Sequence, residues 1–126
     1  PWGFKRLVMA GLIGDIHVFL VHLALNRHTR ERQLDVLGDL VGSCREPVIL
    51  AGDFNTFEGV SELDELTRKT GLTNVNSEHL PTFPAWHPRR QLDFILASDD
   101  INVRGFSVLK GIRLSDHLPL MLDFDV

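Results

Sequence analysis

Four short polar clusters interrupt apolar segments of the sequence and contain the residues best suited to chemistry. A carboxylate inside an apolar strand is costly to bury unless a cation or a hydrogen-bond donor pairs with it. Asp93 lies in such a segment, and His117 is a natural partner for it. A carboxylate bound to one imidazole nitrogen fixes the tautomer and raises the basicity of the other nitrogen. The sequence therefore predicts an acid–base dyad. The clusters are His22 and residues 52–55, 92–95 and 115–117.

The remaining polar residues of these clusters offer oxygen atoms as ligands. Asp53, Asn55 and Asp116 form a set that suits Mg²⁺ or Mn²⁺ and is too small for a zinc site. A divalent cation neutralises phosphate oxygens, orients an in-line attack and lowers the pKa of bound water. The sequence thus predicts phosphoester hydrolysis. Each cluster alone is more often structural, because Asp and Asn after a strand commonly form turns.

Composition indicates a single globular domain. The chain has 126 residues, 44% of them hydrophobic and 24% charged. Its net charge of −4 disfavours indiscriminate binding to nucleic acid. Cys44 is the only cysteine, so neither an intrachain disulfide nor a thiolate cluster can form. The strongest apolar stretch, residues 16–25, is too short to cross a bilayer, and without a secretory pattern we expect a cytoplasmic location.

The N-terminal part of the sequence predicts a β-hairpin. Segments 5–13 and 16–23 are apolar, and Gly14-Asp15 between them is typical of a two-residue turn. The second segment is apolar at successive positions, which favours a strand covered on both faces.

Two amphipathic helices and four further strands are expected after the hairpin. Thr29 is the predicted N-cap of a helix to Val41, and Ser61 with Asp64 resembles a capping box for a helix that stops near Gly71. The elements predict an α/β sandwich of the α+β type, with helices outside packed sheets. The first helix presents Leu34, Leu37, Leu40 and Val41 on one face, the strands are 47–51, 91–97, 103–109 and 118–124, and residues 73–90 form a long loop.

The motifs Val-His-Leu, Ile-Leu-Ala-Gly-Asp-Phe-Asn, Leu-Asp-Phe-Ile-Leu and Ser-Asp-His-Leu-Pro-Leu occur in this order from His22 to Leu120. Together they resemble the endonuclease/exonuclease/phosphatase superfamily, whose fold is deoxyribonuclease I-like. The resemblance implies a four-layer α/β sandwich with mainly antiparallel sheets and a metal-dependent phosphoesterase activity.

The resemblance also implies a role for each residue of the motifs. His22 is expected to hydrogen-bond the scissile phosphate, and Asp53 and Asn55 to position water, metal or phosphate. Asp116 is expected to be a metal ligand, while Asp93 orients His117 near the phosphate. The motifs leave open whether Asp53 or His117 is the general base, and we favour Asp53.

The sequence departs from the family pattern in its length. Family domains are considerably longer and begin with a half that carries an Asn and a metal-binding Glu, and neither motif precedes the hairpin. We therefore expect residues 1–126 to be the C-terminal half of such a domain, with an incomplete metal site and weak or no activity on its own. Its partners would be a phosphoester substrate, from a small molecule, a lipid headgroup or a nucleic acid, and either the N-terminal half or a second copy.

Several alternatives remain at this stage. The chain could be a non-catalytic half-domain that binds a partner or itself through the face left uncovered. Ser115 as a nucleophile is disfavoured because no Gly-x-Ser-x-Gly surrounds it, and zinc hydrolysis because the histidines lack metal-binding spacing. On the long loop, Trp86, Arg89 and Arg90 are candidates to stack on or clasp the substrate.

Overall fold

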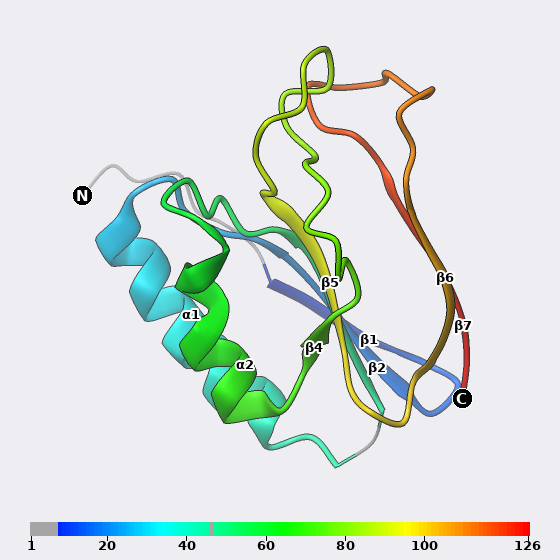
Figure 1. Ribbon diagram of the computed structural model, residues 1–126. Coiled ribbons are helices and arrows are strands. Elements are labelled where there is room, and N and C mark those ends of the chain that lie inside the picture. Colours follow the sequence, from blue (N-terminus) through cyan, green and yellow to red (C-terminus); the bar gives the residue numbers. More distant parts are fainter. Residues whose placement is uncertain (1–7, 46) are drawn as a thin grey trace.

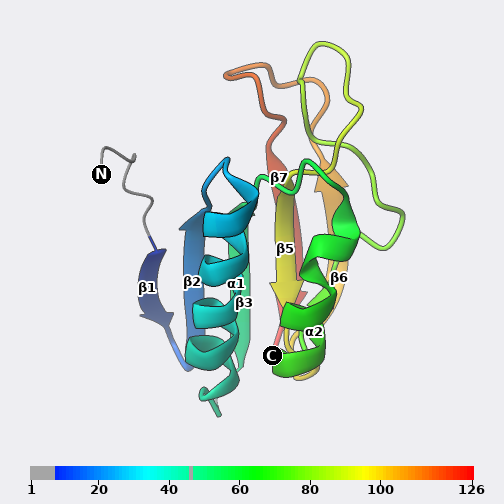
Figure 2. The same ribbon diagram turned by 90° about the vertical axis from the view of Figure 1, so that its left-hand side faces the viewer.

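Two helices and two β-sheets form three layers in the computed structural model, which describes residues 8–45 and 47–126. Helices α1 (Arg27–Gly42) and α2 (Asp64–Thr70) cover one face of a five-stranded sheet. On its other face lies a two-stranded antiparallel sheet of β6 (Asn102–Val108) and β7 (Leu120–Asp125). Figure 2, turned by 90°, shows the two helices side by side in front of the larger sheet. None of the described helices is both long and apolar enough to span a membrane.

The larger sheet has the strand order β1-β2-β3-β5-β4. All neighbouring strands pair antiparallel except β2 and β3, which are parallel and are connected by α1. Parallel neighbours need such a crossover, because a hairpin reverses the chain. The five strands are β1 (Val8–Ile13), β2 (Ile16–His22), β3 (Val48–Asp53), β5 (Asp93–Ala97) and β4 (Thr73–Asn74).

Alternation along the strands divides the core into two apolar clusters. In β3, Leu50 packs toward the helices with Phe19 and Phe94, whereas its neighbour Ile49 packs on the opposite face. The second cluster lies between the sheets and includes Leu120 of β7. A strand with apolar side chains on both faces is the pattern expected for the middle of such a stack. The sheet that carries the polar clusters is therefore fixed from both sides.

Most predicted elements are present, with shifted ends. The hairpin forms with Gly14-Asp15 at its turn, although positions 5–7 lie outside the described residues. The strand predicted over 47–51 extends to Asp53, and the predicted loop 73–90 contains β4 and an isolated bridge between Phe83 and Arg90.

Two predictions about the first helix are wrong, and one about the hairpin holds only in part. The N-cap is Asn26, whose side chain accepts from the backbone N–H of Thr29 at 3.0 Å, so Thr29 lies in the first turn. Leu40 is exposed because it lies at the outer edge of the stripe of Leu34, Leu37 and Val41 on the helical wheel. In β2, Ile16 is buried between the sheets and Val18 packs against the same cluster, but Leu20 is 48% exposed, so β2 is covered on both faces only over its first part.

The predicted capping box at the second helix does not form. Ser61 lies within a 3₁₀ turn, Val60–Leu63, and α2 begins at Asp64 without a side-chain cap. The carboxylate of Glu62 instead accepts from the backbone N–H of Glu58 at 3.1 Å, so this turn is stabilised by the residue beside the predicted cap.

Gly52 limits how β3 can lie beside β2. Its φ is +138°, a region that L side chains rarely adopt, and a Cβ there would overlap with the backbone carbonyl of Val21. Both strands are in the middle of the sheet, so the backbone cannot shift without breaking the pairing. The residue directly before Asp53 is therefore restricted to glycine.

We predict that Gly52→Ala lowers the free energy of unfolding by about 3 kcal/mol or more, because strain and backbone overlap add together. Chemical denaturation measures this loss. Gly11→Ala is the matched control, since Gly11 lies in β1 with nothing within 4 Å of an added Cβ, and it is expected to be nearly neutral. Equal stabilities of the two variants would contradict the close approach of β2 and β3.

Candidate active site

Strand register brings three of the predicted residues to one edge of the larger sheet. His22, the last residue of β2, is paired with Asp53, the last residue of β3. Asp53 is in turn paired with Asp93, the first residue of β5, because β3 and β5 are antiparallel. An imidazole and two carboxylates thus lie in one row across the sheet, at the C-terminal ends of β2 and β3 and the N-terminal end of β5.

The carboxylate of Asp53 lies between two imidazoles. Its Oδ2 is 3.5 Å from Nε2 of His22 and 3.7 Å from Nε2 of His117. His117 comes from the turn before β7, so the second sheet contributes to the same site. The Asp53 side chain is 18% exposed, whereas the His22 side chain is 50% exposed. His22 is therefore the member of the row most accessible to a ligand.

Asp93 and His117 form the closest contact between two of the predicted site residues. The Nδ1 atom of His117 lies 2.7 Å from Oδ2 of Asp93. An ionised carboxylate only accepts hydrogen bonds, so in this pairing Nδ1 carries the proton and donates. The other ring nitrogen, Nε2, then faces Asp53. The structure brings together the two side chains that the sequence predicted as a dyad.

The surroundings shift the pKa values of His117 and of the adjacent Asp53. Burial is the largest influence on His117 and lowers its pKa, but the hydrogen bond and charge of Asp93, with the charges of Asp53 and Asp116, outweigh it, so the pKa is raised. Burial also raises the pKa of the Asp53 carboxyl. The charge of Asp93 acts in the same direction, while the backbone N–H of Asn55 and the two imidazoles oppose it.

Asn55 is buried and connects the loop after β3 to the end of β2. Its φ of +51° is unusual for a residue other than glycine. The side-chain Nδ2 donates to the carbonyl of Leu23 at 2.7 Å, and the backbone N–H donates to Oδ1 of Asp53 at 2.9 Å. In this structure Asn55 therefore fixes the positions of the strand ends that carry His22 and Asp53.

A buried arginine holds the segment that follows β2. Arg30 of α1 is 1% exposed and donates to the carbonyls of Ala24 and Leu25 at 3.1 and 2.9 Å. Its guanidinium also donates twice to Glu62, at 2.9 and 2.7 Å. A buried cation needs such partners, since leaving it without a carboxylate would cost several kcal/mol, about 3–5 in comparable cases. The helix layer thus fixes the chain just beyond His22.

The groups close enough to hold one metal ion together differ from the predicted ligand set. Among the described residues, Asp53, Asp93 and His117 have ligand atoms within 4.8 Å of one another. Two carboxylates and one imidazole suit Mn²⁺ and accept Mg²⁺ less readily, since Mg²⁺ prefers oxygen. Asp116 is outside this group, its side chain is exposed, and its backbone carbonyl accepts from Ala85 N–H at 2.7 Å. Of the two aspartates in the predicted ligand set, the cluster thus includes Asp53 and not Asp116.

The loop before β5 lies against His117 through an aromatic contact that the sequence did not predict. The ring centroid of Phe83 lies 4.8 Å from that of the His117 imidazole, and the rings of Phe83 and Phe57 meet edge to face with their centroids 6.1 Å apart. Arg90 covers Phe57 at 5.6 Å and donates to its carbonyl at 2.6 Å. Arg90 is thus held by Phe57, whereas Trp86, 65% exposed, and Arg89 face solvent.

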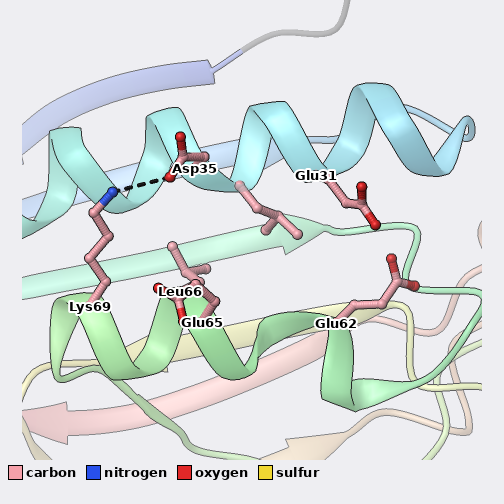
Figure 3. A pocket seen from close by; sticks show the side chains of 7 residues that line it. Glu31, Asp35, Glu62, Glu65, Leu66 and Lys69 are labelled. Carbon is pink, nitrogen blue, oxygen red and sulfur yellow. Dashed lines mark hydrogen bonds and ion pairs between the residues drawn. The ribbon is translucent and has the colours of Figure 1, made fainter.

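Two depressions differ in their relation to the site. One, of about 310 Å³, has Asp53 and Asp93 among its lining residues, with apolar side chains such as Leu20 for the rest. The other, of about 230 Å³, lies between α1 and α2, and none of its lining residues belongs to the site (Figure 3). Its lining residues are Glu31, Leu34, Asp35, Glu62, Glu65, Leu66 and Lys69.

Curated relatives match this chain over most of its length but are much longer than it. A UPF0294 protein from Yersinia pestis is 33% identical over 119 residues, which cover 90% of this chain and 43% of the relative. The uncharacterized protein YbhP from Escherichia coli is 34% identical over 113 residues, which cover 83% and 44%. The chain therefore spans less than half the length of these relatives.

Solved structures share the fold. An endonuclease/exonuclease/phosphatase from Beutenbergia cavernae has a TM-score of 0.74 at 19% identity, covering 95% of this chain and 39% of that one. An AP endonuclease from Archaeoglobus fulgidus has a TM-score of 0.70 at 16% identity, covering 94% and 65%. These similarities confirm the predicted α+β class with mainly antiparallel sheets.

The sequence profile of the endonuclease/exonuclease/phosphatase family matches residues 2–117, which include all of the side chains that meet at the sheet edge. The order of the four motifs, the strand register and the family profile thus agree, and this chain belongs to the endonuclease/exonuclease/phosphatase family.

Proposed function

We propose that this chain is the C-terminal half of a phosphoesterase domain that hydrolyses a phosphoester by metal-assisted, in-line attack of water. The observation that carries the proposal is the convergence of His22, Asp53, Asp93 and His117 at one sheet edge. Membership of the family supports the same class of reaction. The length of the curated relatives supports a larger parent domain.

Asp53 is the proposed general base. A base is most effective when its pKa lies closer to the working pH than that of an ordinary carboxyl, and burial raises the pKa of Asp53 in that direction. Asp53 would take a proton from water as the new P–O bond forms and the bond to the leaving oxygen breaks. Asp93 holds His117 by the 2.7 Å contact, and His117 would hydrogen-bond the phosphate or the leaving oxygen.

His22 and the long loop are proposed to bind the substrate. The half-exposed imidazole of His22 can donate to a phosphate oxygen at the open side of Asp53. Asn55 supports that position through Leu23. Trp86 and Arg89 are exposed near the Phe83 contact and would stack on or clasp the rest of a small-molecule, lipid or nucleic-acid phosphoester. Arg90 would act mainly by supporting Phe57 and, through it, Phe83.

A divalent cation fits the charge of the site. Asp53 and Asp93 are neighbours in the register, and the ion pairs described for them involve only histidines. We propose that Mg²⁺ or Mn²⁺ is held by Asp53 with Asp116, whose exposed side chain adjoins His117, and with the amide oxygen of Asn55. The cation would neutralise phosphate oxygens and lower the pKa of bound water.

We expect the wild-type chain to hydrolyse bis-p-nitrophenyl phosphate slowly, and only with added Mn²⁺ or Mg²⁺. Asp53→Asn and His117→Gln should each reduce the rate by about 10²–10⁴-fold, the usual contribution of a positioned acid or base. Release of p-nitrophenol measures the rate. Mn²⁺ should also broaden the NMR signals of the His117 ring, which tests the metal site independently of turnover.

Matched controls are Asp15→Asn in the hairpin turn and His28→Gln on the exposed face of α1. Both should leave the rate and the broadening unchanged. The proposal would be rejected if neither hydrolysis nor broadening of His117 occurs, or if the Asp53 and His117 variants retain the full rate.

A non-catalytic, self-associating half-domain is the second candidate function. Met9 and Ile13 of β1 and Leu20 of β2 are 62%, 67% and 48% exposed. Met9 is paired with Leu20, and Ile13 lies four residues along β1, so alternation places all three on one face of the sheet. Exposed apolar patches of this kind mark interaction surfaces. A second copy of the chain could cover the face by an isologous contact.

If this candidate is right, light scattering will detect a dimer that dissociates on dilution, and Leu20→Glu will abolish it by placing a charge in the contact. Val36→Glu is the control, because Val36 is 64% exposed on the helix layer. A monomer at every concentration would exclude self-association without affecting the hydrolase proposal.

The raised pKa of Asp53 predicts a cost in stability. Because the native pKa lies above the ordinary value, the ionised carboxylate destabilises the native state at about pH 7. Asp53→Asn should therefore raise the free energy of unfolding there. The gain should shrink as pH falls through the native pKa and vanish below the ordinary value of 3.8. Urea denaturation measures it, and a variant less stable than wild type at neutral pH would contradict the burial argument.

A further inference from the structure

We propose that Thr82 is a positioning residue for the Asp93–His117 pair, and that its hydroxyl sets the orientation of the Asp93 carboxylate. The proposal rests on the proposed function for its catalytic consequence, but not for its structural content. Thr82 was not among the candidates from the sequence, where it is one polar residue in a loop with three prolines.

The hydroxyl of Thr82 has a fixed direction. Thr82 is fully buried, with 0% of its surface exposed. Its Oγ1 accepts from the backbone N–H groups of Leu92 and Asp93, both at 3.2 Å. A hydroxyl has two lone pairs and one proton, so these two contacts leave the proton for a third partner. That partner is Oδ2 of Asp93, at 2.6 Å.

Two donors therefore meet at one carboxylate oxygen. Oδ2 of Asp93 accepts from Thr82 Oγ1 and also lies 2.7 Å from His117 Nδ1. The short distances are typical of hydrogen bonds to an ionised acceptor. Held from two sides, the carboxylate cannot rotate about its terminal torsion without losing both contacts. The Nδ1–H tautomer of His117 is then the one that satisfies Asp93.

The backbone of Thr82 reaches the same elements. Its carbonyl accepts from Leu118 N–H at 2.8 Å, one residue after His117. Its N–H donates to the carbonyl of Arg90 at 2.8 Å. Thr82 therefore joins the start of β5, the loop that carries Phe83, and the turn that carries His117. A residue in this place controls both the partner and the backbone of the imidazole.

The catalytic consequence concerns the other ring nitrogen. With Nδ1–H held by Asp93, Nε2 of His117 faces Asp53 and the proposed phosphate position. Without the Thr82 hydroxyl, the Asp93 carboxylate gains freedom and the ring can populate the opposite tautomer. Groups that orient a functional histidine in this way contribute about 10–100-fold. The loss should fall on kcat, since Thr82 is too buried to touch the substrate.

The test compares Thr82→Val, which removes the hydroxyl at nearly equal volume, with Thr82→Ser, which keeps it. Ring ¹⁵N shifts and the downfield Nδ1–H signal of His117 are recorded by NMR in metal-free protein at one fixed pH. We expect Nδ1–H in wild type and Thr82→Ser, and a weakened signal with mixed tautomers in Thr82→Val. Hydrolysis of bis-p-nitrophenyl phosphate should fall about 10–100-fold in kcat for Thr82→Val, with KM unchanged and the rate restored in Thr82→Ser.

An unchanged tautomer and signal in a folded Thr82→Val would overturn the proposal. If that variant fails to fold, the wild type and Thr82→Ser provide the test. An Nε2–H tautomer of His117 in wild type, or loss of the Nδ1–H signal in Thr82→Ser, would contradict the proposal. The NMR readout needs no turnover. A chain with neither hydrolysis nor Mn²⁺ broadening of the His117 signals, but with the expected tautomers, would disprove the proposed function and leave the role of Thr82 intact.

Discussion

The pairing of β2, β3 and β5 in one register is the constraint on which the rest of the site depends. It places His22, Asp53 and Asp93 in a row at the end of the strands. The parallel pair requires the α1 crossover, and the close approach at Val21 requires glycine at position 52. A slip by one residue would turn each side chain to the opposite face and separate the groups. The chemistry of the site is thus fixed by backbone geometry before any side-chain contact forms.

The register places two carboxylates side by side, and their negative charges repel each other. Burial raises the cost of ionising Asp53, and the charge of Asp93 at the neighbouring position raises it further. The structure offsets this cost with donors: the Asn55 N–H at Asp53, and the Thr82 hydroxyl and His117 at Asp93. The raised pKa of Asp53 therefore lowers the stability of the fold and improves the carboxylate as a base, a trade-off that is common where a carboxylate must accept a proton.

Sequence patterns predict much of this arrangement and fail at particular places. The hairpin, the α1 stripe and the Asp93–His117 contact follow from alternation, helical period and the need of a buried carboxylate for a partner. The cap at Asn26 was missed because Asn26 and Thr29 are both good caps and only the chain path selects one. Thr82 was missed because its partners lie 10, 11 and 36 residues away and leave no local pattern.

The apolar face and the polar site are parts of one surface. Leu20, which is half-exposed on β2, lines the same depression as Asp53 and Asp93. Whatever covers Leu20 also closes one side of the carboxylates, excludes water from them and strengthens every charge interaction in the site. The two candidate functions are therefore coupled, because association at this face changes the solvation of Asp53. This chain spans less than half the length of its curated relatives and still holds the residues of the site together. The strength of the charge interactions among them depends on what covers the apolar face at Leu20.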